Sequence, residues 1–427
     1  MNAQKNLLIC GDNLNALDDL IKKGIQADLI YLDPPFFSNR HYEVIWGDEA
    51  EVRSFRDRWE GGMNVYIGWM KERIVKMYDV LKETGSFYLH CDWHASHYLK
   101  VMLDDVFGYK YFRDEIIWCY EDIGGKATAY FKRKHDVLFF YVKSDESTFN
   151  IQYKKLSEST IERYKKYFDA SGKLTYRHLK ETNPGVFKKL KGIPEDLDGV
   201  WLDIHKGQPL SDWWVDISAI RKGFNEFLGY PTQKPEALLE RVIKSSSNKG
   251  DIVLDPFCGC GTALTVAQKL GRRWMGIDIS PTAVNLITER LEKAGAARGI
   301  NFEVVGMPTT LKELRKLEPF EFQNWVINEM KARQSKKLSS DFGLDGYYEK
   351  TIFTAHAGIQ VKQSENVGRN VVDNFETALS RGKFEKGFIV AFSFTKGAHE
   401  EAARKKGEGL EIRLIEVEDL LLGKVKI

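Results

Sequence analysis

The sequence has little of what would place a protein in a membrane or outside the cell. Its five cysteines, in 427 residues, form no CxxC pair, so we expect reduced thiols and no disulfide framework. No apolar run is long enough to cross a bilayer, and the first residues, MNAQKNLLICGD, lack the apolar core of a signal peptide. We therefore expect a cytoplasmic protein with no membrane partner.

An excess of charge of either sign is also missing. The 63 Lys and Arg residues nearly balance the 61 Asp and Glu residues, which leaves a formal net charge of +2. Overall charge therefore predicts no nucleic-acid partner, and any attraction to phosphates must come from a local patch. A hydrophobic content of 43% is ordinary for a folded chain, and the length is sufficient for two or three domains.

Apolar segments of strand length alternate with segments of helical periodicity up to about residue 145 and again from about residue 231. This alternation predicts an α/β fold with a mostly parallel sheet and helices on both faces. The expected strands are Leu7–Cys10, Leu29–Leu32, Gly85–His90, Val137–Val142, Ile252–Leu254 and Trp274–Ile277. The expected helices are Val65–Leu81, His97–Phe107, Ala237–Ser245 and Thr282–Ala294.

The alternation is interrupted by a basic segment. Between Ile151 and Ile193 there are 11 Lys or Arg residues against 4 Asp or Glu, with six Tyr or Phe among them. A further block with its own strands and helices follows the second alternating region. We therefore divide the chain into four parts: 1–145, an insert at 146–228, 229–308, and a C-terminal block at 309–427.

A glycine-rich turn follows one of the predicted strands. In DIVLDPFCGCGTA, at residues 251–263, the strand ends at Asp255, and Gly259 and Gly261 lead into a helix. Glycines there let the backbone approach a ligand closely, and Asp278, at the end of the next strand, can accept hydrogen bonds from a ribose diol. The order predicts an adenosine-bearing cofactor, although a tight turn without a ligand would need the same glycines.

NAD is a weaker candidate for that cofactor than S-adenosylmethionine. The third glycine of the dinucleotide fingerprint would fall at Leu264, and an acid and a proline flank the turn where a pyrophosphate would lie. Asp255 favours a cofactor with a positively charged end. S-adenosylmethionine carries both an amino group and a sulfonium.

A second strand ends abruptly in LIYLDPPFFSN, at residues 29–39. The carboxylate of Asp33 and a proline carbonyl could accept the two N–H groups of an exocyclic base amine and free its lone pair for methylation. Pro34 and Pro35 would fix the turn, and Phe36 would stack on an extruded base. The structural alternative is a strand terminator followed by a core ring.

Taken together, DPPF, DPFCGCGTA and YPTQKPEALLERVI (Tyr230–Ile243) resemble the amino-methylating DNA methyltransferases of the N6-adenine and N4-cytosine type. The catalytic motif precedes the cofactor motif, as in their beta class, and the resemblance covers roughly residues 5–305. It implies a Rossmann-like S-adenosylmethionine-dependent methyltransferase fold with permuted motif order. It also implies double-stranded DNA as partner.

The resemblance implies a role for each matching residue. Asp33, Pro34, Pro35 and Phe36 match the catalytic tetrapeptide, with Phe36 where tyrosine is commoner. The acid at the first position resembles the adenine-directed members, so N6 of adenine is the expected target and N4 of cytosine the alternative. The residues implied to bind the cofactor are Asp12, Lys234, Asp255, Phe257, Gly259, Gly261, Thr262 and Asp278.

The insert at 146–228 falls where this family places its target-recognition region. Its lysines suit phosphate neutralisation, which positions a protein on DNA without reading sequence. A solvated lysine-rich face is the alternative. The lysines in question are Lys154, Lys155, Lys165, Lys166, Lys188, Lys189 and Lys191.

The segment HCDWHASH offers four candidate metal ligands in His90, Asp92, His94 and His97. His94 and His97 could share a helical face, but His90 belongs to the preceding strand and no thiolate is well placed. We therefore do not predict a zinc site here.

The C-terminal block contains a second possible active site. Asp345 follows a turn in FGLDGYY, and Gln360 and Lys362 share one face of a strand in GIQVKQS. An acid, a polar ligand and a lysine can hold a divalent metal and polarise a water for phosphodiester attack. The pattern resembles Mrr-like restriction endonucleases of the PD-(D/E)xK superfamily, which implies Asp345 as a ligand of Mg²⁺ and Glu321 as an accessory acid.

We therefore expect a site-specific DNA methyltransferase, within a restriction-modification or defence system, with a small α/β endonuclease-like domain. A cytosine-N4 enzyme with a non-cleaving DNA-binding appendage is the alternative. A DNA-binding protein that uses the cofactor only structurally, and an RNA or protein methyltransferase, are two further hypotheses. Whether the protein forms a homodimer is left open.

Overall fold

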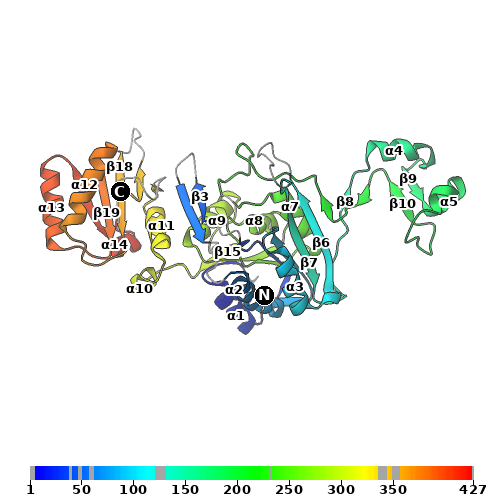
Figure 1. The fold of residues 1–427 in the computed structure, drawn as a ribbon, viewed down its shortest axis with the longest axis horizontal. Helices are drawn as coiled ribbons and strands as arrows, with labels where there is room; N and C mark the ends of the chain where they lie inside the picture. The colour runs from blue at the N-terminus through cyan, green and yellow to red at the C-terminus, as the bar shows by residue number, and fades with distance from the viewer. Residues whose placement is uncertain are drawn as a thin grey trace.

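The computed structural model shows an elongated molecule with a central body, a small lobe at one end and a C-terminal lobe at the other (Figure 1). Among the residues it describes, none of the helices has the length and apolar character needed to span a bilayer. The structure describes residues 5–37, 62–120, 131–230, 232–334, 344–348 and 356–425, and the backbone alone of 41–46 and 51–56.

The central body is built on a nine-stranded sheet with the order β12-β6-β7-β5-β2-β13-β14-β1-β15. Every neighbouring pair is parallel except the two that involve β7, which runs antiparallel to β5 and β6. The structure therefore confirms the predicted mostly parallel α/β sheet. The strands are β1 (Asn6–Cys10), β2 (Ala27–Leu32), β5 (Leu81–Cys91), β6 (Phe112–Cys119), β7 (His135–Val142), β12 (Trp213–Trp214), β13 (Ile252–Asp255), β14 (Arg273–Asp278) and β15 (Phe302–Val305).

Helices cover both faces of this sheet. Side chains alternate along β2, so Leu29 and Tyr31 belong to one apolar core and Ile30 and Leu32 to the other. Burial on both faces explains why the strands are nearly continuous apolar runs. One face packs α1 (Asn13–Lys22), α2 (Met63–Val80) and α3 (Ser96–Phe107), and the other packs α7 (Glu236–Ser246), α8 (Thr262–Lys269) and α9 (Pro281–Lys293).

The small lobe is joined to the central body by an antiparallel pair, β8 (Tyr153–Lys154) and β11 (Gln208–Pro209). Its own apolar core contains Leu156, Leu174, Leu179 and Leu202. It comprises α4 (Glu158–Tyr164), η2 (Lys165–Tyr167), β9 (Lys173–Thr175), α5 (Tyr176–Thr182), α6 (Pro184–Phe187) and β10 (Val200–Asp203).

The separate lobe is thus shorter than the predicted insert at 146–228. The strand β12 lies inside that range but pairs with β6 and extends the main sheet. The central body also includes η1 (Tyr109–Tyr111), and β3 (His41–Trp46) and β4 (Glu51–Arg56) form a separate antiparallel hairpin.

The C-terminal lobe is a second α/β unit, as predicted. Its five-stranded sheet has helices α11 and α14 on one face and α12 and α13 on the other. The strands are β16 (Arg333–Gln334), β17 (Gly346–Tyr348), β18 (Ala357–Lys362), β19 (Lys386–Ala391) and β20 (Glu411–Glu416). The helices are α10 (Leu311–Leu314), α11 (Pro319–Glu329), α12 (Arg369–Gly382), α13 (Lys396–Gly407) and α14 (Val417–Leu421).

Candidate active site

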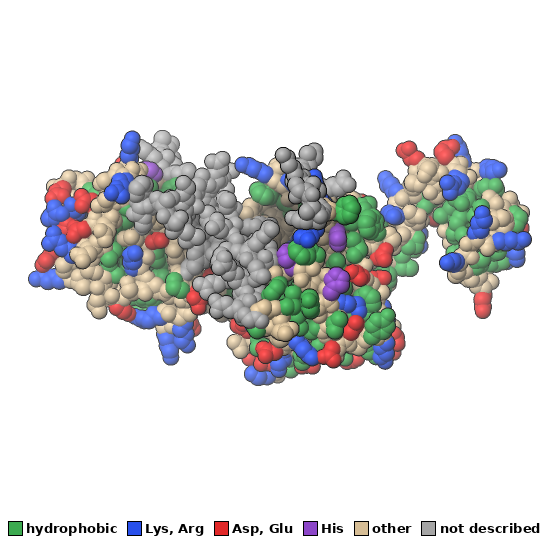
Figure 2. Space-filling model, viewed as in Figure 1, with side chains coloured by type: hydrophobic (Ala, Val, Ile, Leu, Met, Phe, Trp, Pro, Cys, Tyr) green, Lys and Arg blue, Asp and Glu red, His purple; other side chains and the backbone are tan. Residues whose placement is uncertain are grey.

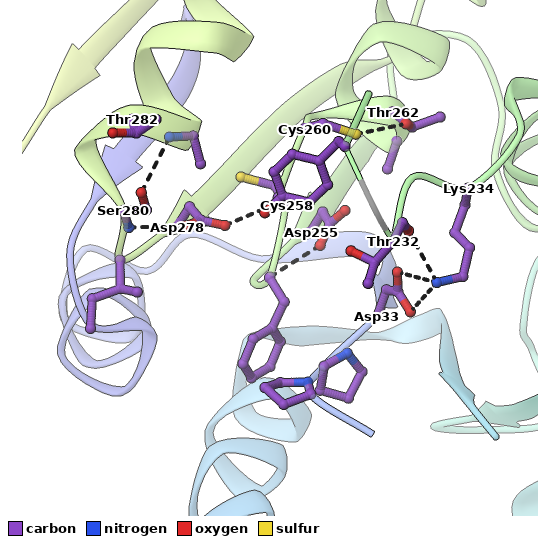
Figure 3. A pocket seen from close by; sticks show the side chains of 18 of the residues that line it. Asp33, Thr232, Lys234, Asp255, Cys258, Cys260, Thr262, Asp278, Ser280 and Thr282 are labelled. Carbon is purple, nitrogen blue, oxygen red and sulfur yellow. Dashed lines mark hydrogen bonds and ion pairs between the residues drawn. The ribbon is translucent and has the colours of Figure 1, made fainter. Parts of the chain in front are cut away.

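A cavity lies at the carboxyl ends of three adjacent parallel strands. Asp33 directly follows β2, Asp255 is the last residue of β13, and Asp278 is the last residue of β14. Because these strands are neighbours in the sheet, their terminal acids line the same space, with Asp255 between the other two (Figure 3). The structure thus brings the DPPF segment and the glycine turn together although more than 200 residues separate them.

The carboxylate of Asp33 is held by a lysine from a distant segment. The ammonium of Lys234 donates to Asp33 Oδ1 at 2.8 Å and to Oδ2 at 2.6 Å. It also donates to the carbonyl of Thr232 at 3.3 Å and lies 4.9 Å from the centroid of the Phe36 ring. Lys234 therefore fixes the orientation of the acid that begins the tetrapeptide.

The two prolines of the tetrapeptide have different surroundings. The hydroxyl of Tyr66, on α2, donates to the carbonyl of Pro35 at 2.7 Å. Phe37 follows with φ +60°, an uncommon conformation for a residue with a side chain, and its ring packs 5.5 Å from that of Tyr66. Since Tyr66 already engages Pro35, the carbonyl of Pro34 is the better candidate for contact with a ligand.

Asp278 holds the glycine turn, which lies across the cavity from Asp33. Its Oδ2 accepts from the backbone N–H of Gly259 at 2.8 Å, and its Oδ1 accepts from that of Ser280 at 2.9 Å. Gly261 has φ +75°, and a Cβ there would lie 2.7 Å from Cγ1 of Ile287. Position 261 therefore requires glycine both for its conformation and for the packing of α8 against α9.

Two acids of the cavity, Asp255 and Asp278, are costly to ionise. Burial raises the pKa of Asp255 well above its ordinary value, against one hydrogen bond from the N–H of Phe257 at 3.1 Å, and neighbouring Asp33 and Asp278 raise it further. Burial likewise raises the pKa of Asp278 to about 6, although its two backbone hydrogen bonds favour the charged form. A positively charged ligand would stabilise the ionised forms of these carboxylates, so the acidic side chains of the cavity suit a cation.

His90 lies beneath the tetrapeptide and is fully buried. Its Nδ1 is 2.9 Å from the hydroxyl of Tyr31, and its Nε2 is 3.1 Å from Oδ2 of Asp136. Its ring centroid is 5.8 Å from that of Phe36. Both ring nitrogens of His90 are thus engaged, and His90 contacts two residues that line the cavity, Tyr31 and Phe36.

The other candidate ligands of HCDWHASH have local partners. His94 Nδ1 is 2.7 Å from Oδ2 of Asp92, and His97 Nδ1 is 3.2 Å from the hydroxyl of Ser96. In the part of the chain that the structure describes, no three His, Cys, Asp or Glu side chains are grouped as metal ligands would be.

Most of the residues implied to bind a cofactor line the cavity, with two exceptions. Asp12 caps α1, accepting from the N–H of Leu14 at 2.8 Å, and pairs with Arg73 at 2.8 Å. Gly261 acts through backbone conformation. The lining also contains residues that sequence reasoning did not single out, among them Tyr230, Thr232, Cys258, Cys260, Ser280 and Asn324.

The second predicted site lies at the carboxyl end of β18, the central strand of the C-terminal sheet. Asp345 Oδ2 accepts from the N–H of Val361 at 2.6 Å, which places this acid beside the strand that bears Gln360 and Lys362. Burial raises the pKa of Asp345 to about 6, against the opposing effect of Lys362.

The prediction that Glu321 is an accessory acid of that site is wrong. Its carboxylate lines the cavity of the central body and accepts a hydrogen bond from the hydroxyl of Ser280 at 3.2 Å. The reason is the geometry of α11. Phe322, Val326 and Met330 share the face that packs in the C-terminal core, whereas Glu321 shares a different face with Asn324, three positions along the helix.

Comparison with known families agrees with this arrangement. The DNA methylase family model matches residues 27–289, which is more than half of the chain. The chain belongs to the DNA methylase family. The restriction endonuclease family model matches residues 314–422 of the same DNA methylase. Both resemblances seen in the motifs are thereby confirmed.

Three curated relatives of this DNA methylase illustrate the similarity. The type II methyltransferase M.EcaI of Enterobacter cloacae is 27% identical, over 78% of this chain and 80% of the relative. The type II methyltransferase M.HpaI of Haemophilus parainfluenzae is 28% identical, over 78% and 94% respectively. The DNA adenine methyltransferase YhdJ of Escherichia coli K12 is 28% identical, over 67% and 83%.

Solved structures similar to this DNA methylase include TTHA0409 from Thermus thermophilus, complexed with S-adenosyl-L-methionine. It is 18% identical, covers 71% of this chain and 100% of its own, and has a TM-score of 0.41. The cytosine-N4-specific PvuII DNA methyltransferase is 16% identical, covers 66% and 86%, and has a TM-score of 0.40.

Proposed function

We propose that this DNA methylase transfers a methyl group from S-adenosylmethionine to N6 of an adenine extruded from double-stranded DNA. The observation that carries the proposal is the shared cavity, in which Asp33 and the glycine turn face each other from adjacent strand ends. Adenine is favoured over cytosine by the acid at position 33 and by the similarity to a relative named as an adenine methyltransferase.

The acids of the cavity suit the methyl donor. Asp278 would accept from the ribose hydroxyls, since each of its oxygens keeps a lone pair beyond its backbone hydrogen bond. Asp255 would neutralise the amino group at the other end, with Phe257 and Thr262 beside it. When bound, S-adenosylmethionine supplies an electrophilic methyl group on a positively charged sulfur.

The opposite wall would hold the base. The carboxylate of Asp33 and the carbonyl of Pro34 would accept the two N–H groups of the exocyclic amine. This draws the nitrogen toward a tetrahedral geometry and frees its lone pair, otherwise delocalised into the purine ring, for attack on the methyl group. Lys234 keeps the carboxylate in place. Phe36 would stack on the extruded base, which cannot be reached inside the duplex.

The small lobe is proposed as the part that holds the DNA duplex. All seven lysines named above are exposed, and Lys and Arg side chains are spread over this lobe (Figure 2). Such side chains neutralise phosphates. We accordingly keep the division of the methyltransferase into 1–145 and 229–308 around a target-recognition region, of which residues 153–209 form the separate lobe.

The reaction is tested directly with DNA of mixed sequence and S-adenosylmethionine labelled in its methyl group. Digestion to nucleosides and mass spectrometry should recover the label in N6-methyladenine. Recovery in N4-methylcytosine would contradict the choice of base, and transfer to RNA or protein but not to DNA would contradict the substrate class. No transfer to any of these would overturn the proposal.

The affinity for S-adenosylmethionine should fall as the pH falls. In the free protein, burial raises the pKa of Asp278 to about 6, so this acid takes up a proton in mildly acidic solution, and burial also raises the pKa of Asp255 well above its ordinary value. A cationic ligand favours their charged forms, and its binding must release the protons they hold. We expect the dissociation constant to rise by up to about tenfold per pH unit for each proton released.

Isothermal titration calorimetry between pH 7.5 and pH 5 measures this slope. Repeating the titration in buffers of different ionisation enthalpy counts the protons released. An affinity that is constant or that increases toward pH 5 would contradict the assignment of these acids to the cofactor.

A second activity is favoured by the match to the restriction endonuclease family. We propose that the C-terminal domain cleaves DNA with Mg²⁺ held by Asp345, and that Lys362 stabilises charge on the reacting phosphate. Lys362→Ala should then reduce cleavage of unmethylated DNA by about 10²-fold or more, a typical loss for a group that stabilises transition-state charge. Lys396→Ala, at an exposed lysine of α13, is the matched control and should cleave normally.

The measurement is the rate of supercoiled plasmid nicking with Mg²⁺ and with EDTA. Equal rates for Lys362→Ala and wild type would show that this lysine is not catalytic. If the wild-type protein does not nick DNA at all, the domain is a DNA-binding appendage.

A further inference from the structure

Helix α11 belongs to the endonuclease domain but presents one face to the methyltransferase. Phe322, Val326 and Met330 pack in the core of the C-terminal lobe. On the other face, Glu321 and Asn324 line the methyltransferase cavity. The helix is therefore amphipathic. Its apolar face packs in the C-terminal core, and its polar face lines the methyltransferase cavity.

Direct hydrogen bonds connect α11 to the turn that follows β14 and to the first turn of α9. The hydroxyl of Ser280 donates to the carboxylate of Glu321 at 3.2 Å, and Asn328 Nδ2 donates to the hydroxyl of Thr282 at 2.9 Å. The N–H of Ser280 is bonded to Asp278. One residue, Ser280, thus links Glu321 to the acid proposed to hold the ribose.

The surroundings of Cys10 also place Glu321 in this part of the cavity. The thiol of Cys10 lies at the carboxyl end of β1, the strand next to β14. Burial raises its pKa to about 12, with further contributions from the carboxylates of Asp278 and Glu321. The hydrogen bonds of Ser280 to both acids agree with this, and Figure 3 shows Ser280 and Asp278 at the end of the cavity away from Asp33 and Lys234.

The chemistry of the two side chains on α11 fits the nucleoside part of the cofactor. A carboxylate accepts hydrogen bonds from a ribose hydroxyl or from the amino group of adenine. An amide such as that of Asn324, which is 3% exposed, both donates and accepts, as the edge of adenine does. A phosphate does not suit this end of the cavity, because the carboxylates of Asp255, Asp278 and Glu321 would repel it.

We propose that α11 of the endonuclease domain supplies Glu321 and Asn324 as ligands of the nucleoside end of the methyl donor. The inference rests on the proposed function, since it takes S-adenosylmethionine as the occupant of the cavity. The site is then completed by a domain that lies outside the methyltransferase match at residues 27–289.

A ligand that contacts both domains couples them. If docking of α11 strengthens cofactor binding by some factor, cofactor binding strengthens the docking of α11 by the same factor. The strength with which the endonuclease domain docks on the methyltransferase therefore depends on whether the cofactor is bound. This coupling needs no contact between the two active sites.

The first test compares substitutions on the two faces of one helix in the full-length protein. Glu321→Gln and Asn324→Ala should each weaken binding of S-adenosylhomocysteine by about tenfold, the usual effect of losing a buried hydrogen bond to a ligand. Glu329→Gln is the matched control, because Glu329 is exposed at the end of α11 and does not line the cavity. The same losses with methylthioadenosine, which lacks the amino-acid end, would place the contact on the nucleoside.

The second test uses the wild-type protein and needs no substitution. S-adenosylhomocysteine should slow amide hydrogen exchange both in the glycine turn, at residues 256–262, and in α11, at residues 319–329. Slowing in the turn alone, together with normal binding by Glu321→Gln and Asn324→Ala, would overturn this inference and leave the methyltransferase assignment standing. No binding and no slowing in either segment would overturn both.

Discussion

Replacement of Asp33 by asparagine is expected to reduce the rate of methyl transfer by about 10³-fold, within the range measured for groups that handle protons in a reaction. The amide keeps the size of the side chain but replaces one acceptor oxygen by a donor. In the present structure both carboxylate oxygens of Asp33 face the ammonium of Lys234, so an amide nitrogen there would oppose another donor. The variant would thus lose both its acceptor for the base amine and its own anchoring.

Cofactor binding should separate this effect from unfolding. Asp33 lies across the cavity from the glycine turn, so S-adenosylmethionine should still bind Asp33→Asn with an affinity close to that of the wild type. The rate is measured as label incorporated into DNA in a single turnover, with Asp79→Asn, at an exposed position on α2, as the matched control. Full activity of Asp33→Asn would show that the target base does not bind at Asp33, and it would contradict the proposed mechanism.

The central sheet was predictable because its signals are local. Strands such as β2 and β13 are buried on both faces, which leaves short apolar runs that stand out from their surroundings. The acids Asp33, Asp255 and Asp278 could be placed in one crevice by the rule that parallel strands share their carboxyl ends. No long-range contact had to be known for that step.

The remaining parts of the site depend on packing between distant segments. Glu321 has the sequence context of the endonuclease domain, but the face of α11 that it occupies turns it toward the methyltransferase. Tyr66 and Lys234 hold the tetrapeptide from 31 and 201 positions away, counted to Pro35 and Asp33 respectively. Sequence spacing predicts which side chains share one face of a helix or strand. It does not predict which other helix or strand that face will contact.

Asp278→Ala is expected to weaken cofactor binding by about 100-fold, since hydrogen bonds to a charged group each contribute about 1.5–3 kcal/mol. Two effects combine in this loss. The ribose loses its acceptor, and the N–H groups of Gly259 and Ser280 lose the carboxylate that holds their two loops together. Asp278→Asn should lose nearly as much, because one of its two positions becomes a donor facing an N–H donor.

The pH dependence of stability distinguishes this binding role from a structural one. The pKa of Asp278 is raised to about 6 in the folded protein, so the folded state holds its proton more tightly than the unfolded state does. The wild type therefore loses stability as the pH rises from the unfolded pKa toward that value, and Asp278→Ala, which has no group to ionise, does not. Thermal unfolding without cofactor should show a smaller gap between the two proteins at pH 7.5 than at pH 4.5. A gap that widens toward pH 7.5 would mean that the charged carboxylate stabilises the fold, and the weaker cofactor binding of the variant would then reflect a disordered turn.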